Sequence, residues 1–127
     1  MIRAAALVLV ACLVAAPAFA GEPAVSPVSQ EALIERQQKA DADLFVLDVR
    51  SPEEFAAGHV PGAVNIPHDR LAERLMDVPK DKDVVVYCQS GRRAGLAAKV
   101  LADNGYTRLG QLDGDIAAWK ANGRPLE

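Results

Sequence analysis

The chain has 127 residues, half of them hydrophobic, with 14 basic and 17 acidic residues and a net charge of −3. This length suits a single domain built around one core. A mildly acidic chain has no electrostatic reason to bind nucleic acid or anionic lipid, so we expect neither as a partner.

The N-terminal segment has the pattern of a cleavable signal peptide. Residues 1–3 carry a positive charge, an apolar run over 4–16 follows, and 18–20 (Ala-Phe-Ala) form a small-x-small cleavage site. The apolar run is shorter than the roughly 20 residues that a membrane-spanning helix needs. We therefore expect residues 1–20 to be removed, and the mature chain to be periplasmic or secreted without a membrane anchor. A lipoprotein cleavage box at 9–12 (Leu-Val-Ala-Cys) is the alternative.

After the signal peptide, helix and strand patterns alternate. Residues 21–27 are rich in Pro, Ala and Ser and are interpreted as a flexible leader to a domain over 28–127. Ser29 is expected to cap a helix that runs through about Lys39. The apolar run 44–49 predicts a strand buried on both faces.

The next pattern is a helix start, with Ser51 as cap, Pro52 at the first helical position, Glu54 completing a capping box and Gly58 ending the helix. The remaining expected elements are a strand over 63–66, a helix over 70–76 capped by Asp69, a strand over 84–87, a helix over 92–103, a strand over 106–112 and a short helix around Trp119. This alternation predicts an α/β domain with a mainly parallel sheet. In such folds, ligands bind beyond the carboxyl ends of the strands.

Cys88 lies at such an end and opens the segment 88–93 (Cys-Gln-Ser-Gly-Arg-Arg). A strand-to-helix turn can direct backbone N–H groups at an anion. Gly91 permits backbone angles that other residues resist, and Arg92 and Arg93 add positive charge. Each feature favours the thiolate over the thiol, so we expect Cys88 to be a nucleophile. The alternative is a buried, inert cysteine.

The spacing of Cys88, Gly91 and Arg93 resembles the active-site loop of the rhodaneses, the thiosulfate sulfurtransferases. Further similar segments are 47–50 (Leu-Asp-Val-Arg), 53–55 (Glu-Glu-Phe), 58–67 (Gly-His-Val-Pro-Gly-Ala-Val-Asn-Ile-Pro), 105–106 (Gly-Tyr) and 112–119. With a signal peptide and one short domain, the chain is most similar to the periplasmic single-domain rhodaneses of the phage-shock-protein E kind. One departure is Asp115, where the family commonly has a second glycine after Gly114.

The resemblance implies a rhodanese-like α/β fold, with a mainly parallel central sheet of about five strands and helices on both faces. It also implies that Cys88 takes sulfane sulfur from thiosulfate or a similar small anionic donor. The Cys88 persulfide then passes that sulfur to cyanide or a thiol acceptor, in a ping-pong mechanism. Neither a cofactor nor a metal is implied, and we expect a monomer.

The residues after Cys88 are expected to bind the substrate. Gln89 and Ser90 are expected to contribute backbone N–H groups, while their side chains shape access for the acceptor. Arg93 is expected to bind an anion or to stabilise the loop. Arg92 either shares that role or faces solvent.

Four residues outside the loop have two interpretations each. Asp48 and Arg50 either brace the site or form an ion pair that ties their strand to the helix containing Glu54. His59 is interpreted as a structural hydrogen-bonding residue rather than a general base. His68 lies at a strand end, where it either lines the rim of a pocket or plays a structural part.

Two other classes of function are weighed against sulfur transfer. Cysteine phosphatases and arsenate reductases use related loops, but these phosphatases place one more residue between cysteine and arginine than the four between Cys88 and Arg93. An arsenate reductase would also lack a second cysteine once Cys12 is removed. A non-catalytic binding module on the same fold typically lacks the nucleophile, which is present here.

Overall fold

The computed structural model of the chain describes residue 11 and residues 24–127. The expected signal peptide, with its cleavage after Ala20, lies outside the described residues except for residue 11. Within the described part, no helix is both long and apolar enough to cross a membrane. The elements are β1 (Val25–Val28), α1 (Gln30–Gln38), β2 (Leu44–Asp48), α2 (Pro52–Ala56), β3 (Val64–Asn65), the 3-10 turns η1 (Leu71–Glu73) and η2 (Leu75–Asp77), β4 (Asp83–Tyr87), α3 (Arg92–Asp103), β5 (Leu109–Leu112) and α4 (Asp115–Ala121).

The five strands form one parallel sheet in the order β1-β5-β4-β2-β3. β4 is the central strand, and α3 leads from it to β5. The neighbouring β2 leads through α2 in the opposite direction, to β3. Because the connections diverge between β2 and β4, their carboxyl ends form the switch point at which parallel sheets bind ligands.

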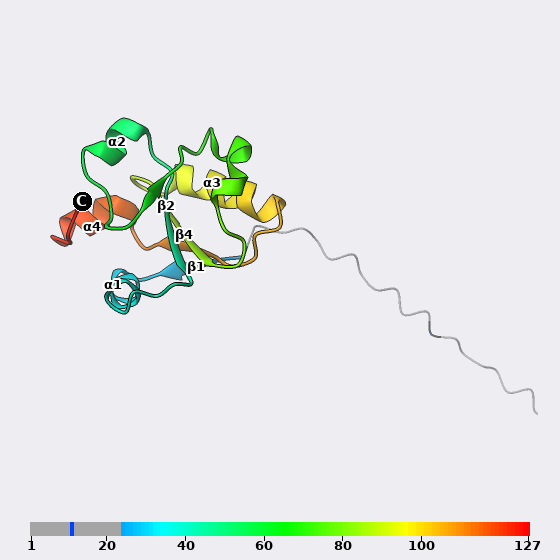
Figure 1. Cartoon of the computed structure of the whole chain (residues 1–127), viewed down its shortest axis with the longest axis horizontal. Coiled ribbons are helices and arrows are strands. Elements are labelled where there is room, and N and C mark those ends of the chain that lie inside the picture. Colours follow the sequence, from blue (N-terminus) through cyan, green and yellow to red (C-terminus); the bar gives the residue numbers. More distant parts are fainter. Residues whose placement is uncertain (1–10, 12–23) are drawn as a thin grey trace, which may run out of the picture.

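Helices cover both faces of the sheet, as predicted (Figure 1). Because successive strand residues point to opposite faces, β4 contributes to two separate cores. Val84 and Val86 pack in the core that α3 covers, together with Cys88. Val85 and Tyr87 pack in the core that α1 and α4 cover. The predicted α/β class is therefore confirmed.

The local helix signals are also confirmed. The Ser29 hydroxyl accepts a hydrogen bond from Ala32 N (3.1 Å) at the start of α1. At α2, Ser51 accepts from Glu54 N (3.1 Å), and Glu54 accepts from Ser51 N (3.4 Å), which completes the capping box. α3 spans the predicted range, 92–103.

The leader predicted over 21–27 is wrong for its last three residues. Residues 25–28 form β1, which pairs with β5 at the edge of the sheet. An edge strand tolerates a proline such as Pro27, because one side of the strand has no ladder partner. Because β1 contains Ser26 and Pro27, its composition resembles that of a loop, and the sequence analysis assigned it to the leader.

The helix predicted over 70–76 is wrong as well. Two 3-10 turns take its place. The first begins at Leu71, and its N-cap residue is Arg70 without a side-chain cap, so Asp69 is not the predicted cap. Arg74, between the turns, has φ −123° and ψ 24°, which interrupts a continuous helix. The last strand starts at Leu109 rather than residue 106, because Tyr106 directs its hydroxyl to Val78 O (2.6 Å) instead of joining the sheet.

Candidate active site

Cys88 follows directly after β4, at the carboxyl end of the central strand. The residue is 1% exposed, and Gln89 and Ser90 beside it are exposed. Gly91 N donates a hydrogen bond to Cys88 Sγ (3.0 Å). The sulfur thus combines apolar surroundings with a backbone donor that stabilises negative charge.

The first turn of α4 holds the rest of the loop. Cys88 N donates to a carboxylate oxygen of Asp115 (3.0 Å). The carbonyls of Cys88 and Gln89 accept from Ile116 N (3.1 Å) and Ala117 N (3.2 Å). The sequence analysis expected several backbone amides around the sulfur. In the structure, the amide that donates to Cys88 Sγ is that of Gly91, whereas the amide of Cys88 anchors the loop to Asp115.

Gly91 has φ +116°, in the region that favours glycine. A β-carbon at this position would lie 3.2 Å from Asp115 Oδ2 and 3.3 Å from Gln111 Nε2. The backbone conformation therefore favours glycine at this position, and a β-carbon would also press on these two side chains.

Arg93 forms a two-pronged ion pair with Glu54 of α2, at 2.6 and 2.9 Å. The Arg93 guanidinium lowers the pKa of Glu54 to about 2. The pKa of Arg93 is raised, chiefly by Glu54 and less by the nearby Cys88. Arg93 thus ties α3 to α2 near the nucleophile, while Arg92 is exposed at the start of α3.

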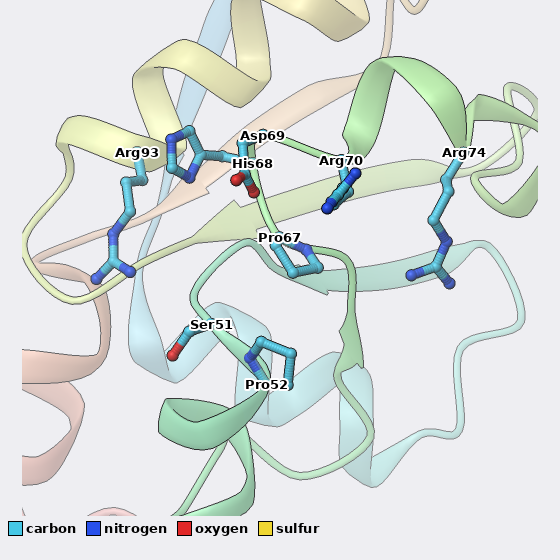
Figure 2. Close-up of a pocket in the computed structure, with 8 residues that line it drawn as sticks. All are labelled: Ser51, Pro52, Pro67, His68, Asp69, Arg70, Arg74 and Arg93. Atoms are coloured by element: carbon cyan, nitrogen blue, oxygen red, sulfur yellow. The ribbon is translucent and has the colours of Figure 1, made fainter.

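A cavity of about 460 Å³ lies beside Arg93, at the carboxyl edge of the sheet. Its wall comes from Ser51 and Pro52, from 67–70, and from Arg74 and Arg93. Figure 2 shows Arg93 and Arg74 on opposite sides of this space. Cys88 is not among the residues that line this cavity. Arg93 lines it and also interacts electrostatically with Cys88, so Arg93 connects the cavity to the sulfur.

His59 has the structural role that the sequence analysis favoured, and His68 has the pocket position that it gave as one of two interpretations. His68 lines the cavity, close to its arginines. The Nδ1 atom of His59 hydrogen-bonds to Phe55 O (2.9 Å), and its ring stacks on Phe55 with a centroid distance of 3.6 Å. His59 is therefore a structural residue of the turn after α2.

Asp48 and Arg50 form a buried ion pair at the end of β2, with Arg50 Nη2 2.7 Å from Asp48 Oδ2. Arg50 also donates to Gly58 O (2.9 Å), beyond the end of α2. The pair thus links β2 to the turn after α2, and Glu54 takes no part because it pairs with Arg93. The ion pair that the sequence analysis gave as one interpretation is present, and it ties the strand to Gly58, just beyond α2, rather than to the helix itself.

The same carboxylate also braces β4. The Tyr87 hydroxyl donates to Asp48 Oδ2 (2.7 Å) and accepts from Val60 N (3.0 Å). Burial, with the Asp48 hydrogen bond, raises the pKa of Tyr87 far above its usual value, so the hydroxyl stays protonated. Because Tyr87 precedes Cys88, this network fixes the strand end from which the nucleophile projects.

Sequence analysis missed three contributors to this region: Tyr87, the pairing of Glu54 with Arg93, and the contact of Asp115 with Cys88. A polar hydroxyl at the end of a buried strand was an available signal for Tyr87, since buried tyrosines find partners. Within residue 11 and residues 24–127, no group of three or more His, Cys, Asp or Glu side chains is placed to hold a metal ion.

A family model, the rhodanese-like domain, matches residues 29–122, and the chain belongs to this family. It is 37% identical over 102 residues to a sulfurtransferase of Allochromatium vinosum, covering 80% of this chain and 94% of that protein. It is 42% identical over 81 residues to the thiosulfate sulfurtransferase PspE of Escherichia coli, covering 61% and 78%. A rhodanese-related protein from Thermoplasma volcanium superposes with a TM-score of 0.70 at 28% identity, over 80% of this chain and 97% of that one. The family and its members assign the chain a sulfur-transfer role between a donor and an acceptor.

Proposed function

We propose that the protein moves a sulfane sulfur from thiosulfate, or a similar small anion, to cyanide or a thiol through a persulfide on Cys88. The observation that carries this proposal is the hydrogen bond from Gly91 N to Cys88 Sγ (3.0 Å) at the end of the central strand. A sulfur in this position is both a nucleophile and a site at which negative charge is stabilised.

In the first step, the Cys88 thiolate attacks the outer sulfur of thiosulfate. A sulfur–sulfur bond forms on Cys88, and the bond to the sulfonate group breaks, so that its electron pair leaves with sulfite. In the second step, cyanide or a thiolate attacks the outer sulfur of the persulfide. The bond to Cys88 breaks, its electron pair returns to Cys88 as the thiolate, and the product is thiocyanate or a new persulfide.

The surroundings favour an anionic donor. Arg70, Arg74 and Arg93 line the cavity beside the loop. Each is paired with a carboxylate, of Glu73, Asp77 and Glu54 respectively, and offers an oxyanion the N–H groups that this pairing leaves over. Arg93 also interacts electrostatically with Cys88. Gln89 and Ser90 are exposed beside the sulfur, where an acceptor would pass.

Steady-state transfer from thiosulfate to cyanide tests this function. We expect parallel double-reciprocal plots when both substrates are varied, because sulfite leaves before the acceptor reacts. Cys88→Ser should abolish turnover while keeping the wild-type melting temperature. Intersecting plots would contradict the persulfide route, and a folded wild type inactive with every donor tested would favour a non-catalytic module.

The proposal extends to the location and state of the protein. Residues 1–20 act as an export signal, and the mature chain is a monomer in the periplasm or outside the cell. N-terminal sequencing of the exported protein should give Gly21 first, and light scattering should give the mass of one chain. An intact N-terminus in the cytosol would contradict the export signal, and the mass of a dimer would contradict the monomer.

A further inference from the structure

Asp115 is a buried carboxylate directly beside the nucleophile. Its side chain accepts from Cys88 N (3.0 Å) through Oδ1, and the residue is 3% exposed. Gln111 Nε2 lies 3.3 Å from Oδ2. Among the described residues, no lysine, arginine or histidine forms an ion pair with Asp115.

The backbone of Asp115 is held in a conformation that most residues avoid. Its φ is +54°, the left-handed region that glycine enters freely and that Asp and Asn enter at some cost. Strain of this kind persists where surrounding contacts fix the residue. Here the fixed contacts are with the loop of Cys88.

The Asp115 carboxylate also interacts with the Cys88 side chain, besides accepting from the Cys88 amide. Burial raises the pKa of the Asp115 carboxyl, against the lowering effect of hydrogen bonds from Cys88 N, from Gln111 and from the Cys88 side chain. Cys88 also interacts with Arg93 of α3, whose charge is shared with Glu54 of α2. A buried carboxylate of α4 therefore lies beside the Cys88 loop, and it forms no ion pair among the residues that the structure describes.

We propose that Asp115 is a positioning residue that anchors the Cys88 loop and sets the pH at which Cys88 becomes nucleophilic. A thiol can donate its proton toward the carboxylate, whereas a thiolate beside an ionised Asp115 is repelled by it. This inference rests on the proposed function of Cys88 as the nucleophile.

The test is the rate of Cys88 alkylation by iodoacetamide as a function of pH, in the absence of any sulfur donor. Asp115→Asn keeps an oxygen that can accept from Cys88 N, removes the charge, and suits a positive φ. We expect its alkylation midpoint to lie roughly one pH unit or more below that of the wild type. Asp113→Asn, an exposed carboxylate in the same turn, removes the same charge and should leave the midpoint unchanged.

Coincident midpoints for Asp115→Asn and the wild type, or a higher midpoint in the variant, would overturn the inference and leave Asp115 as a structural acceptor only. Asp115→Gly provides a second variant that adopts φ +54° without strain, and its midpoint should fall as well. Because alkylation needs no sulfur donor, a shifted midpoint in a protein that transfers no sulfur would contradict the proposed function alone.

Discussion

Replacing Gly91 by alanine tests whether the loop conformation positions the amide on the sulfur. Gly91 holds φ +116° and ψ −22° while its N–H donates to Cys88 Sγ. Alanine at this position must either keep that conformation under strain or move the loop and lose the hydrogen bond. Either outcome is measurable.

The structure gives the size of the effect. A non-glycine residue in such a conformation costs about 1–3 kcal/mol. The new β-carbon would also lie 3.2 Å from Asp115 Oδ2, a tight contact with a buried group. We expect the free energy of unfolding to fall by about 2 kcal/mol, and the melting temperature therefore by about 8–16 °C for a domain of this size. Thermal unfolding and the rate of Cys88 alkylation measure both consequences.

Gly95 provides the matched control, since it lies in the same helix region and undergoes the same substitution. Its β-carbon would have no neighbour within 4 Å, and the residue is exposed in α3. Gly95→Ala should therefore raise stability by about 0.5–1 kcal/mol, because alanine is the better helix former. A Gly91→Ala protein with the wild-type melting temperature and alkylation rate would refute the reasoning about the loop.

Two further predictions concern the contacts around the loop. Tyr87→Phe removes the hydroxyl that donates to Asp48 Oδ2 and accepts from Val60 N, so the free energy of unfolding, measured in urea, should fall by about 1–3 kcal/mol. Wild-type stability in this variant would contradict the bracing role. Glu54→Gln keeps the capping box but removes the charge that is paired with Arg93. Because the side chains of Glu54 and Arg93 are 36% and 26% exposed, the free energy of unfolding at pH 7 should fall by only about 0.5–1 kcal/mol. Because the Glu54 pKa is lowered from 4.5 to about 2, the wild-type advantage is complete above pH 4.5 and disappears as the pH falls through 2. A pH-independent difference between the two proteins would contradict this pairing.

The parts of the fold that local signals determine were predictable. The apolar run of β4, the capping box of Ser51 and Glu54, and the boundaries of α3 depend on residues close together in the chain. The alternation of strands and helices then placed Cys88 at the carboxyl end of a parallel strand. The loop residues that surround Cys88 could therefore be named before the structure was known, although their roles stay predictions.

The remaining features depend on contacts between distant segments. β1 is a strand because it pairs with β5, more than 80 residues later, and its own composition resembles a loop. Glu54 pairs with Arg93, which lies 39 residues later in the chain, and nothing in the residues around Glu54 indicates this partner. Asp115 was recognised as a departure at a turn, but its position under Cys88 follows from how α4 packs against the loop. No local pattern carries that information.

The central claim is that Cys88 carries the sulfur, and the intact mass of the domain after incubation with thiosulfate and desalting tests it most directly. We predict that the wild type gains the mass of one sulfur atom, that cyanide removes this gain, and that Cys88→Ala shows none. A folded wild type whose mass does not change, or an equal gain in Cys88→Ala, would contradict the claim.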